Sequence, residues 1–431
     1  MRASPLTRLL PGVLLTTLAS LACGAAEHAG TASEPTEEAA LQDGDLAARA
    51  REIHERVITI DTHDDIPLDF ATPEVDPLDA DRQVNLQKME EGALDVGFFI
   101  VYVGQTERTP ENYEHAKADA MTKFEAIHRM TEMYAERIEL AYTADDVERI
   151  HGAGKLVAAI GIENGYVIGK DLSLLEKYHG LGARYMTLAH GGHNDIADSA
   201  TPSDDLDDDE EEHGGVSAFG EQVIAEMNRL GILVDVSHIS KNASLDAMRL
   251  SRAPVIASHS SVRALADHAR NMDDEQLRTL AENGGVIQIV ALDRYVKEPA
   301  PGREDAVDAL RDSLGIEGFS SMTDAQRAVF HDGMARIDEA YPPATVSDFV
   351  DHIDSAVDLI GIDHVGISSD FDGGGGVTGW NDASETFAVT LELVRRGYTE
   401  EEIRKIWGAN TLRVWREAAR VAAELQGARS R

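Results

Sequence analysis

The sequence predicts an α/β protein, a (β/α)8 barrel of the TIM type with helical insertions. Short apolar segments rich in β-branched residues alternate along the chain with amphipathic segments of helical period. Strands that are apolar on both faces are typical of parallel sheets covered by helices. Eight strand–helix units within 431 residues fit a closed barrel, and a doubly wound open sheet is the alternative.

The predicted strands share a short apolar run that is followed by polar residues. They are residues 57–61, 96–103, 157–163, 184–189, 232–236, 255–258, 286–290 and 364–369. Helical patterns lie between most of them. The clearest, with apolar residues recurring every three or four positions, are residues 217–230, 241–250, 274–282 and 346–360.

Two segments interrupt this alternation. Residues 202–215 carry eight acids in the nine positions from Asp204 to Glu212. Like charges at this density repel one another and predict a solvated, mobile loop whose role the sequence does not assign. Residues 297–345 are a long insertion of helical character before the last strand.

The C-terminal segment, residues 399–425, also predicts helices. Its large apolar side chains are expected to pack in the core rather than to contact a ligand. They are Trp407, Leu412, Val414 and Trp415.

The chain starts with the pattern of an export signal. A basic start precedes a mostly apolar run, residues 9–22, that is too short for a stable membrane span. Residues 1–22 are therefore predicted to be a signal peptide. The ending LASLAC resembles a bacterial lipoprotein signal with the lipid on Cys23, although Ser20 stands where such signals usually carry Leu. Ordinary secretion is the alternative to this lipid anchor.

The next segment predicts a flexible connection. Residues 23–45 are small, polar and acidic, which is typical of a disordered tether. Residues 46–425 then form a single barrel domain. We expect an exported protein of the bacterial cell envelope, either a periplasmic or outer-surface lipoprotein or a secreted protein.

The composition excludes some partners and some metal sites. Asp and Glu number 78 against 39 Lys and Arg, so the formal net charge of −39 would repel nucleic acids and anionic membrane surfaces. Cys23 is the only cysteine, so neither an intrachain disulfide nor a zinc–thiolate site can form. Any metal must be held by His, Asp and Glu.

Metal-binding and titratable residues stand where the predicted strands end. The first strand leads into His63 and Asp65, and a period of two puts both side chains on one face. The carboxyl ends of barrel strands are where catalytic residues lie. The corresponding residues at other strand ends are Glu163, His190, His238, His259 and Asp370.

A single histidine after a strand is more often a hydrogen-bonded core residue than a ligand. Several at the same relative place favour a metal site, and imidazole with carboxylate suits zinc, manganese or iron. Two metals that share a carboxylate are one such arrangement. Within the first segment, Asp64 is expected to face away from His63 and Asp65, whereas Asp61 is expected to orient an imidazole.

The remaining histidines have no expected place in the metal site. His193 and His213 lie in the loop after His190 and stay unassigned. Six more are expected at the surface or in packing: His54, His151, His179, His268, His331 and His352.

Eight segments together resemble the membrane dipeptidase (renal dipeptidase) family of zinc peptidases, whose barrel is of the metal-dependent amidohydrolase kind. The resemblance covers roughly residues 45–423. The segments, in chain order, are DTHDDIP, GALDVGFFIVYV, GIENGY, ARYMTLAH, GVSAFGEQVIAEMNRLGILVDVSHIS, SRAPVIASHSS, ARNMDDEQL and GISSDFDG.

The resemblance implies a site with two Zn²⁺ ions per subunit. His63 and Asp65 look like ligands of one zinc, and His238 and His259 like ligands of the second. Glu163 looks like the carboxylate that bridges them.

The resemblance also implies the residues that act on the substrate. His190 is similar to the histidine that contacts the scissile carbonyl and steadies the oxyanion. Arg270 resembles the arginine that binds the substrate, and Asp370 the acid/base carboxylate beside the attacking water.

The implied activity is hydrolysis of dipeptides, including those with C-terminal D-residues, by a hydroxide that bridges two metals. A related amidohydrolase acting on N-acyl amino acids or β-lactams is the alternative, and a lipoprotein that only binds metal or peptide is another. The loop after His190 lacks the tryptophan of eukaryotic members, which puts side-chain preference in doubt. Without cysteines in the domain a covalent dimer is excluded, and a non-covalent homodimer stays open.

Overall fold

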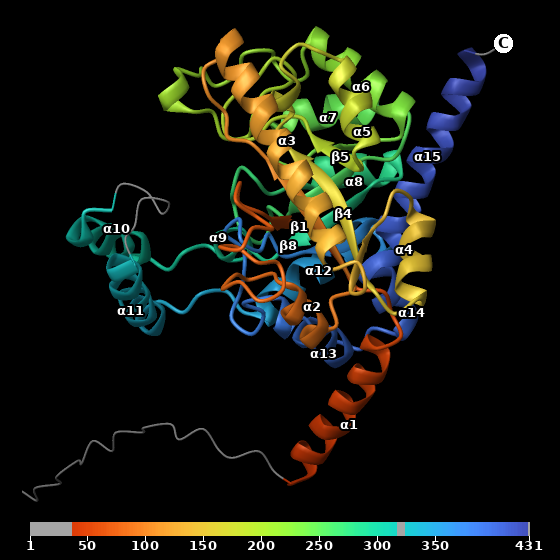
Figure 1. Cartoon of the computed structure of the whole chain (residues 1–431). Helices are drawn as coiled ribbons and strands as arrows, with labels where there is room; N and C mark the ends of the chain where they lie inside the picture. The colour runs from red at the N-terminus through yellow and green to blue at the C-terminus, as the bar shows by residue number, and fades with distance from the viewer. Residues whose placement is uncertain (1–36, 317–323, 430–431) are drawn as a thin grey trace, which may run out of the picture. The chain divides into compact units, whose positions relative to one another are not determined.

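Parallel strands form the centre of the structure (Figure 1). The computed structural model describes residues 37–316 and 324–429, and within these ranges nine strands form one sheet. The chain divides into two units, Met1–Asp43 and Gly44–Arg431, and the sheet belongs to the second. The strands are β1 (Ile60–Asp65), β2 (Val96–Tyr102), β3 (Ile138–Leu140), β4 (Leu156–Glu163), β5 (Ala183–Thr187), β6 (Leu233–Asp235), β7 (Ile256–Ser260), β8 (Val286–Val290) and β9 (Val365–Ser368).

Eight of these strands follow one another around a ring. Their order is β1-β2-β4-β5-β6-β7-β8-β9, and each pairing between neighbours is parallel. The ring closes between β1 and the end of β9, because the Asp65 amide donates to the Phe371 carbonyl at 2.9 Å. β3 lies off this ring and pairs with β4. The predicted parallel barrel is confirmed, and the doubly wound open sheet is wrong.

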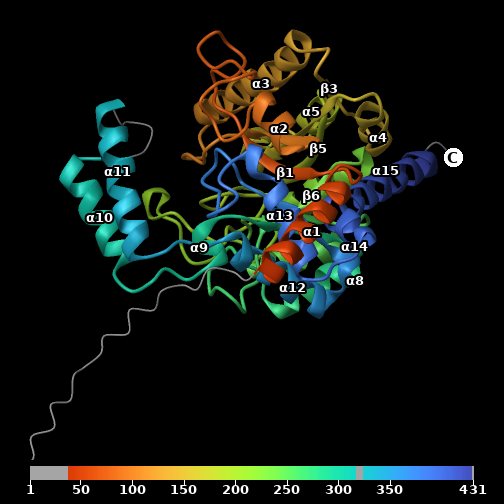
Figure 2. The same cartoon turned by 90° about the horizontal axis from the view of Figure 1, so that it is seen from below.

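Helices surround the strands and connect them (Figure 2). The α-helices of the described ranges are α1 (Glu37–His54), α2 (Leu86–Gly92), α3 (Pro110–Met133), α4 (Ala144–Gly152), α5 (Ser173–Gly180), α6 (Ala218–Leu230), α7 (Lys241–Leu250), α8 (Asp274–Asn283), α9 (Asp293–Val296), α10 (Arg303–Leu314), α11 (Asp324–Ala340), α12 (Val346–Ile360), α13 (Phe387–Arg395), α14 (Glu400–Arg404) and α15 (Asn410–Arg429). A π-helical segment, Lys405–Ala409, joins α14 to α15.

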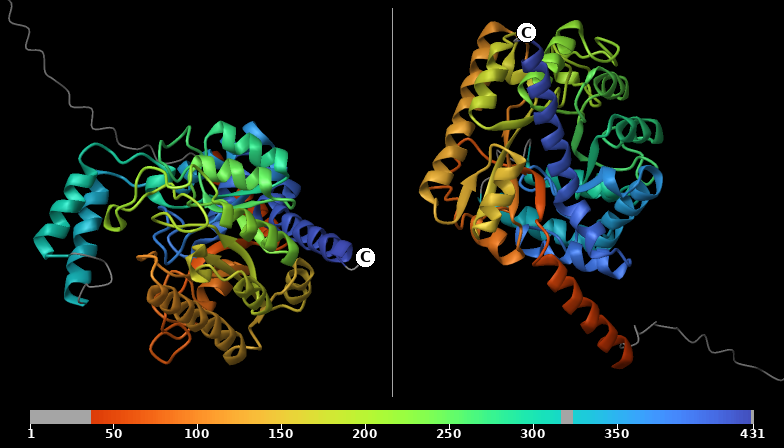
Figure 3. Two further views of the ribbon diagram at one scale, coloured as in Figure 1. Left: turned by 90° about the horizontal axis from the view of Figure 1, so that it is seen from above. Right: turned by 90° about the vertical axis from the view of Figure 1, so that its right-hand side faces the viewer.

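Side chains alternate between the interior of the barrel and its helical cover. In β2, Phe98 and Ile100 belong to one buried apolar cluster, whereas Phe99 and Val101 belong to another. This alternation follows from the period of two along a strand. The ring of Trp415 in α15 lies 5.7 Å from the ring of Phe98, so α15 covers the barrel where the strands begin. Figure 3 (right) shows α15 running beside α4 and α6.

Local chemistry sets the ends of the best-predicted helices. At the start of α12 the Thr345 hydroxyl accepts the Asp348 amide at 3.2 Å, and the Asp348 carboxylate accepts the Thr345 amide at 2.8 Å. At the end of α6, Gly231 has a φ of 85°, in the left-handed region that favours glycine. These capping groups explain why the predictions for α6 and α12 agree with the structure within one residue.

Two strands that carry site residues end later than the sequence predicts. β1 was expected over residues 57–61 but runs to Asp65, and β7 was expected over residues 255–258 but runs to Ser260. Backbone pairing continues past the apolar run, with a register shift in β1 between Asp61 and Asp64. The three-residue strand β3 was not predicted, because so short a segment gives no clear periodicity.

The N-terminal prediction is wrong in part. The expected disordered tether extends to residue 45, whereas α1 begins at Glu37. Ala50 and Ile53 of this helix are buried in the apolar core, which stabilises its C-terminal part. The predicted signal peptide and Cys23 lie outside the described residues. Among the helices of the described ranges, none combines the length and apolar character needed to cross a membrane.

The described parts of the predicted insertion, residues 297–316 and 324–345, are largely helical, as expected. Its helices α10 and α11 pack against each other (Figure 3, left). Arg303 at the start of α10 forms ion pairs with Asp338 of α11 at 2.8 Å and with Asp293 of α9 at 3.2 Å.

The expected packing of the C-terminal segment is confirmed. Its four large apolar residues are all buried in the core, and Trp407 is fully enclosed. The indole N–H of Trp407 donates to the Thr390 hydroxyl at 2.8 Å, so its one polar atom has a partner. The ring also lies edge-on to Trp380, with 6.2 Å between ring centroids.

We expect Trp407→Ala to lower the free energy of unfolding by about 3–5 kcal/mol, because it opens a cavity in a close-packed core. Urea denaturation measures the change. The matched control is Leu250→Ala on α7, whose residue is 41% exposed; this change should shift stability by less than about 0.5 kcal/mol. Equal losses in both variants would contradict the anchoring role of Trp407.

Candidate metal centre

A cavity of about 820 Å³ opens at the carboxyl ends of the barrel strands. It is lined by all the predicted site residues except His63, which is fully buried next to them. The lining residues from the prediction are Asp65, Glu163, His190, His238, His259, Arg270 and Asp370. The barrel therefore brings together every residue that the sequence singles out.

The carboxylate of Glu163 lies at the centre of this group. Glu163 is the last residue of β4 and is almost fully buried. Its Oε1 atom is approached by the Nε2 atoms of four imidazoles. The distances are 3.0 Å to His238, 3.3 Å to His259, 3.5 Å to His63 and 3.5 Å to His190. Imidazole nitrogens that converge on a carboxylate are typical of a metal centre without thiolates.

Three overlapping sets of side chains could each hold an ion, because one ligand atom from each member lies within 4.8 Å of the others. The sets are His63 with Asp65 and Glu163, Glu163 with His190 and His238, and His63 with His259 and Asp370. The structure thus joins His63 to Asp65, as the sequence indicates. It also places His190 and Asp370 within reach of the same positions.

Hydrogen bonds behind two imidazoles set their orientation. The Tyr185 hydroxyl donates to the Thr62 carbonyl at 2.8 Å, so at 3.0 Å it accepts the Nδ1–H of His63. The Ser258 hydroxyl donates to Asp235 at 2.6 Å, so at 2.8 Å it accepts the Nδ1–H of His259. In the neutral form of each ring, Nε2 is therefore the nitrogen without a proton, as metal coordination requires.

This arrangement fits a bound metal. The Nε2 atom of His63 is buried and has no hydrogen-bond partner among the described residues. A buried polar atom without a partner is costly and calls for a ligand. The donors are imidazole and carboxylate groups, which suit divalent ions such as zinc.

The charges of the cluster also favour metal binding. Burial holds the pKa of His238 and of His259 well below the usual value, so both rings are neutral ligands near pH 7. Burial disfavours the charged form of Glu163 too, but His190 and His63 outweigh it and hold the pKa of Glu163 well below its usual range. Burial opposes protonation of His63, yet Glu163 and Asp65 raise its pKa well above normal.

Asp370 has a backbone and an acidity that set it apart. Its φ of 59° lies in the left-handed region, which is rare outside glycine and clusters at functional sites. Burial, with the charges of Asp65 and Glu163, raises the pKa of Asp370 to about 8. Gly373 leaves room for the side chains of Asp65 and Asp370, since a Cβ there would lie 2.3 Å from Asp65 Oδ2 and 2.6 Å from Asp370 Oδ1.

The expectation that Asp61 orients an imidazole is wrong. Its Oδ1 atom accepts the amides of Ser369 at 2.9 Å and of His63 at 3.2 Å, so Asp61 joins β1 to the end of β9. Asp64 takes no part in the three metal-binding sets. It is fully buried, and its two carboxyl oxygens have no hydrogen-bond partner among the described residues. Burial and the charge of Asp61 raise its pKa well above the usual value.

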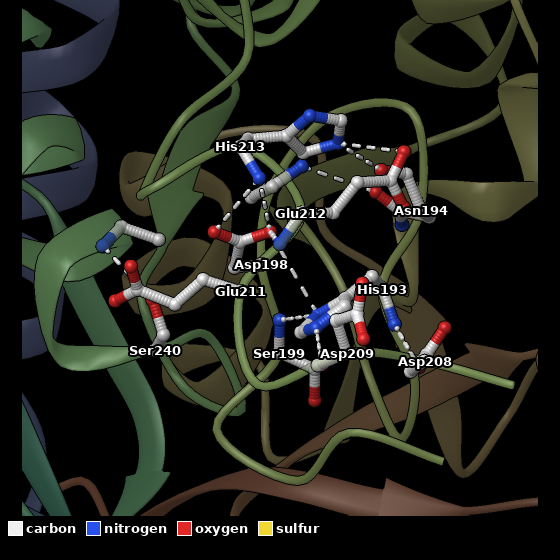
Figure 4. Close-up of polar contacts among 12 residues, drawn as sticks. His193, Asn194, Asp198, Ser199, Asp208, Asp209, Glu211, Glu212, His213 and Ser240 are labelled. Atoms are coloured by element: carbon white, nitrogen blue, oxygen red, sulfur yellow. Dashed lines mark hydrogen bonds and ion pairs between the residues drawn. The ribbon is translucent and has the colours of Figure 1, made fainter. Parts of the chain in front are cut away.

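The acidic loop is folded, so the prediction of a mobile loop is wrong (Figure 4). Buried Asp198 accepts the backbone amides of Glu212, His213 and Gly215 at 2.9 to 3.0 Å. The guanidinium of Arg108 forms a two-pronged ion pair with Glu212 at 2.6 and 3.0 Å. An acid outside the charged run therefore organises its backbone, and a distant arginine offsets part of its charge.

The two unassigned histidines bind the backbone of this loop (Figure 4). Nδ1 of buried His193 accepts the Ser199 amide at 2.9 Å, so its Nε2–H donates to the Asp209 carbonyl at 2.8 Å. Nε2 of His213 lies 2.8 Å from the Asn194 carbonyl. Both histidines have structural partners and do not point to a further ligand site.

The segment just before the acidic loop is bonded directly to two residues of the candidate centre. The Ser199 hydroxyl donates to the His190 carbonyl, and the Ala200 amide donates to the His238 carbonyl at 2.7 Å. His238 has a φ of 66°, an unfavourable conformation that such bonds help to hold. Ser199 and Ala200 thereby fix the backbone of His190 and His238.

Twelve further residues line the cavity that the sequence analysis did not select. Those with a basic or aromatic side chain are Arg82, Tyr102, Lys123, His268, Arg294 and Tyr295. Tyr102 ends β2 and could have been found by its place at a strand end. Lys123 stands in the middle of α3, where nothing in the local pattern indicates a site. His268, expected at the surface or in packing, faces Tyr295 with 4.5 Å between ring centroids.

Comparison with known proteins gives consistent results. The sequence model of the membrane dipeptidase family, peptidase family M19, matches residues 47–429. Dipeptidase tcpJ of Claviceps purpurea is 34% identical over 80% of this chain and 71% of its own length. Dipeptidase verJ of Clonostachys rogersoniana is 30% identical over 90% of each chain. The crystal structure of the probable dipeptidase PvdM from Pseudomonas aeruginosa superposes with a TM-score of 0.78 at 34% identity, covering 88% of this chain and all of that one.

We expect Tyr185→Phe to weaken metal binding by about tenfold, because the hydroxyl that orients His63 is lost. Competition with a chelator measures the affinity. Tyr178→Phe is the matched control, since this buried hydroxyl donates to the Val167 carbonyl away from the cavity. Unchanged affinity in Tyr185→Phe would contradict the orienting role.

Asp64 should make the metal-free protein less stable as pH rises. Its folded-state pKa lies above that of the unfolded chain, about 4. Asp64 therefore keeps its proton in the folded state after the unfolded chain has lost it. The free energy of unfolding falls as pH rises from about 4 toward the folded-state pKa. Urea denaturation gives the free energy of unfolding of Asp64→Asn and of the parent at pH 5 and pH 8. Going from pH 5 to pH 8, this free energy should change in favour of Asp64→Asn by at least about 1 kcal/mol. Exposed Asp69→Asn is the control, and parallel pH curves for Asp64→Asn and the parent would refute the expectation.

Proposed function

Because the chain belongs to the membrane dipeptidase family (peptidase family M19), metallopeptidases that hydrolyse dipeptides, we propose that it does so with two zinc ions bridged by Glu163. The observation that carries this proposal is the approach of four imidazole Nε2 atoms to one Glu163 oxygen, at 3.0 to 3.5 Å. A carboxylate at this position can serve ions on both of its sides.

The chain supplies a separate pair of ligands for each ion. His63 and Asp65 would hold one ion, with His63 Nε2 and Asp65 Oδ2 3.7 Å apart. His238 and His259 would hold the other, with their Nε2 atoms 2.7 Å apart. When bound, two zinc ions would polarise the scissile carbonyl and lower the pKa of the attacking water.

Asp370 is the proposed acid/base. Its carboxyl lies 3.9 Å from His63 Nε2, beside the proposed zinc position. A pKa raised to about 8 shows that its proton is held more tightly than in an exposed carboxyl. A carboxylate in this position would take the proton from water and deliver it to the leaving amine, and bound cations would bring its pKa down toward working pH.

His190 and Arg270 are proposed to position the substrate. His190 Nε2 faces Glu163 at 3.5 Å, and a quarter of the His190 side chain is exposed to the cavity, so it can donate to the developing oxyanion. Arg270 is 97% buried, donates to the His259 carbonyl at 3.1 Å and leaves its Nε without a partner among the described residues. A planar guanidinium with free donors suits a substrate carboxylate.

The proposals for the location and oligomeric state of the protein rest on the sequence alone. The N-terminal pattern supports export, either anchored through lipid on Cys23 or secreted. A non-covalent homodimer agrees with the absence of cysteine from the domain. These proposals are independent of the site and do not affect the chemistry.

The metal-loaded full-length protein should hydrolyse simple dipeptides such as Ala-Ala, and Glu163→Gln should lose both metal and activity. Asp370→Asn is the matched variant: we expect kcat to fall by about 10²–10⁴ while metal content stays at the parental level. Product amines report the rate, and elemental analysis reports the metal.

The outcomes separate the competing activities. Preference for N-acetylated dipeptides or β-lactams over free dipeptides would favour the alternative amidohydrolase. No hydrolysis by metal-loaded protein would overturn the proposal. Loss of metal from Asp370→Asn would show that Asp370 is a ligand rather than the acid/base.

A further inference from the structure

A buried lysine lines the catalytic cavity without a counter-charge. Lys123, in the middle of α3, is only 6% exposed and belongs to the cavity wall. Its Nζ lies 5.6 Å from the centroid of the Tyr102 ring. Within residues 37–316 and 324–429, no carboxylate comes within the 4.0 Å of an ion pair with this ammonium.

A lysine that is this deeply buried without an ion-pair partner is costly for a folded protein. Burial lowers the pKa of Lys123, and the more distant charges of Asp65 and Glu163 only partly offset this. Lysines buried for packing alone are rare, and those that are buried are almost always paired. The missing partner is therefore expected to come from the ligand.

Most other charges of the cavity are already engaged; the exception, Arg294, is exposed and lies beside Tyr295, on the same side as Arg270. Arg82 pairs with Asp372 at 3.2 Å, and Arg270 is proposed for the terminal carboxylate. Of the acids in the wall, Asp65 and Glu163 belong to the metal centre. The unpaired charge of Lys123 thus makes its part of the cavity positive, even though the chain carries a net charge of −39.

The sheet order fixes where Lys123 lies relative to Arg270. Lys123 is next to Tyr102, the last residue of β2, whereas Arg270 follows β7. In the ring β1-β2-β4-β5-β6-β7-β8-β9 these two strands stand on opposite sides. Arg270 contacts the His259 carbonyl, His259 faces Glu163 at 3.3 Å, and Glu163 is the register partner of Tyr102. The metal centre therefore lies between the two cations.

A dipeptide that spans this cavity has a defined direction. With its C-terminal carboxylate at Arg270 and its scissile carbonyl at the metal centre, its N-terminal residue reaches toward Tyr102 and Lys123. We propose that Lys123 forms a subsite for an acidic side chain at the N-terminal residue of the substrate. This inference rests on the proposed dipeptidase function and names its preferred substrates as Glu-Xaa and Asp-Xaa.

The test compares substrates that differ only in charge. For the metal-loaded full chain, kcat/KM for Glu-Ala should exceed that for Gln-Ala by about tenfold or more, the usual effect of a desolvated charge pair. In Lys123→Met the ratio should fall to near one, and in Lys123→Arg it should stay above one. Lys117→Met is the control, because Lys117 is on the same helix but pairs with Glu114 at 2.8 Å outside the cavity wall; its ratio should match the parent.

The outcomes distinguish failure of the Lys123 subsite from failure of the proposed dipeptidase function. Equal rates for Glu-Ala and Gln-Ala in the parent protein would overturn the Lys123 subsite and leave the dipeptidase function standing. A ratio that survives in Lys123→Met, or a preference for Ala-Glu over Ala-Gln in place of the expected one, would overturn the N-terminal assignment. If no dipeptide is cleaved, the proposed function fails and the subsite with it.

Discussion

The charge of one buried carboxylate, Glu163, governs the architecture around it. A carboxylate removed from water costs several kcal/mol unless other groups compensate it. Four imidazoles approach its Oε1 atom, and they come from β1, from the loops after β5 and β6, and from β7. Only a closed barrel with parallel strands brings these chain segments to one point, because all the strand ends then face the same side. The closed parallel barrel is thus what allows four imidazoles to compensate the buried charge of Glu163.

A second set of bonds holds the imidazoles in the correct form. Tyr185 and Ser258 take the Nδ1 protons of His63 and His259, and Asp235 in turn accepts the Ser258 hydroxyl. Neighbouring strands supply these groups, so the sheet register that builds the barrel also selects the tautomer. Ser199 and Ala200, just before the acidic loop, bind the backbone carbonyls of His190 and His238. Geometry at the centre is therefore set by residues that do not face the cavity.

Much of this could be predicted from the sequence, and the exceptions have physical causes. Apolar period and capping groups set the strands and helices, and site residues such as Glu163 stand directly after apolar runs. The predictions that are wrong concern contacts between distant segments. Arg108 and Asp198 order a loop whose local charge predicts mobility. Asp61 likewise accepts the amide of Ser369, just after the closing strand, where the sequence suggested an imidazole. Lys123 was missed because its role comes from where α3 packs.

The strongly acidic composition does not conflict with binding of an anionic substrate. At physiological ionic strength charges are screened over about 8 Å, so acids scattered over the surface contribute little inside the cavity. Charges within the cavity act at shorter range and in a lower dielectric, where each is stronger. Lys123 and Arg270 are both buried there, on opposite sides of the metal centre. These few enclosed cations therefore act on an anionic group in the cavity at short range, whereas the net charge of −39 mainly bears on solubility and on repulsion of other polyanions.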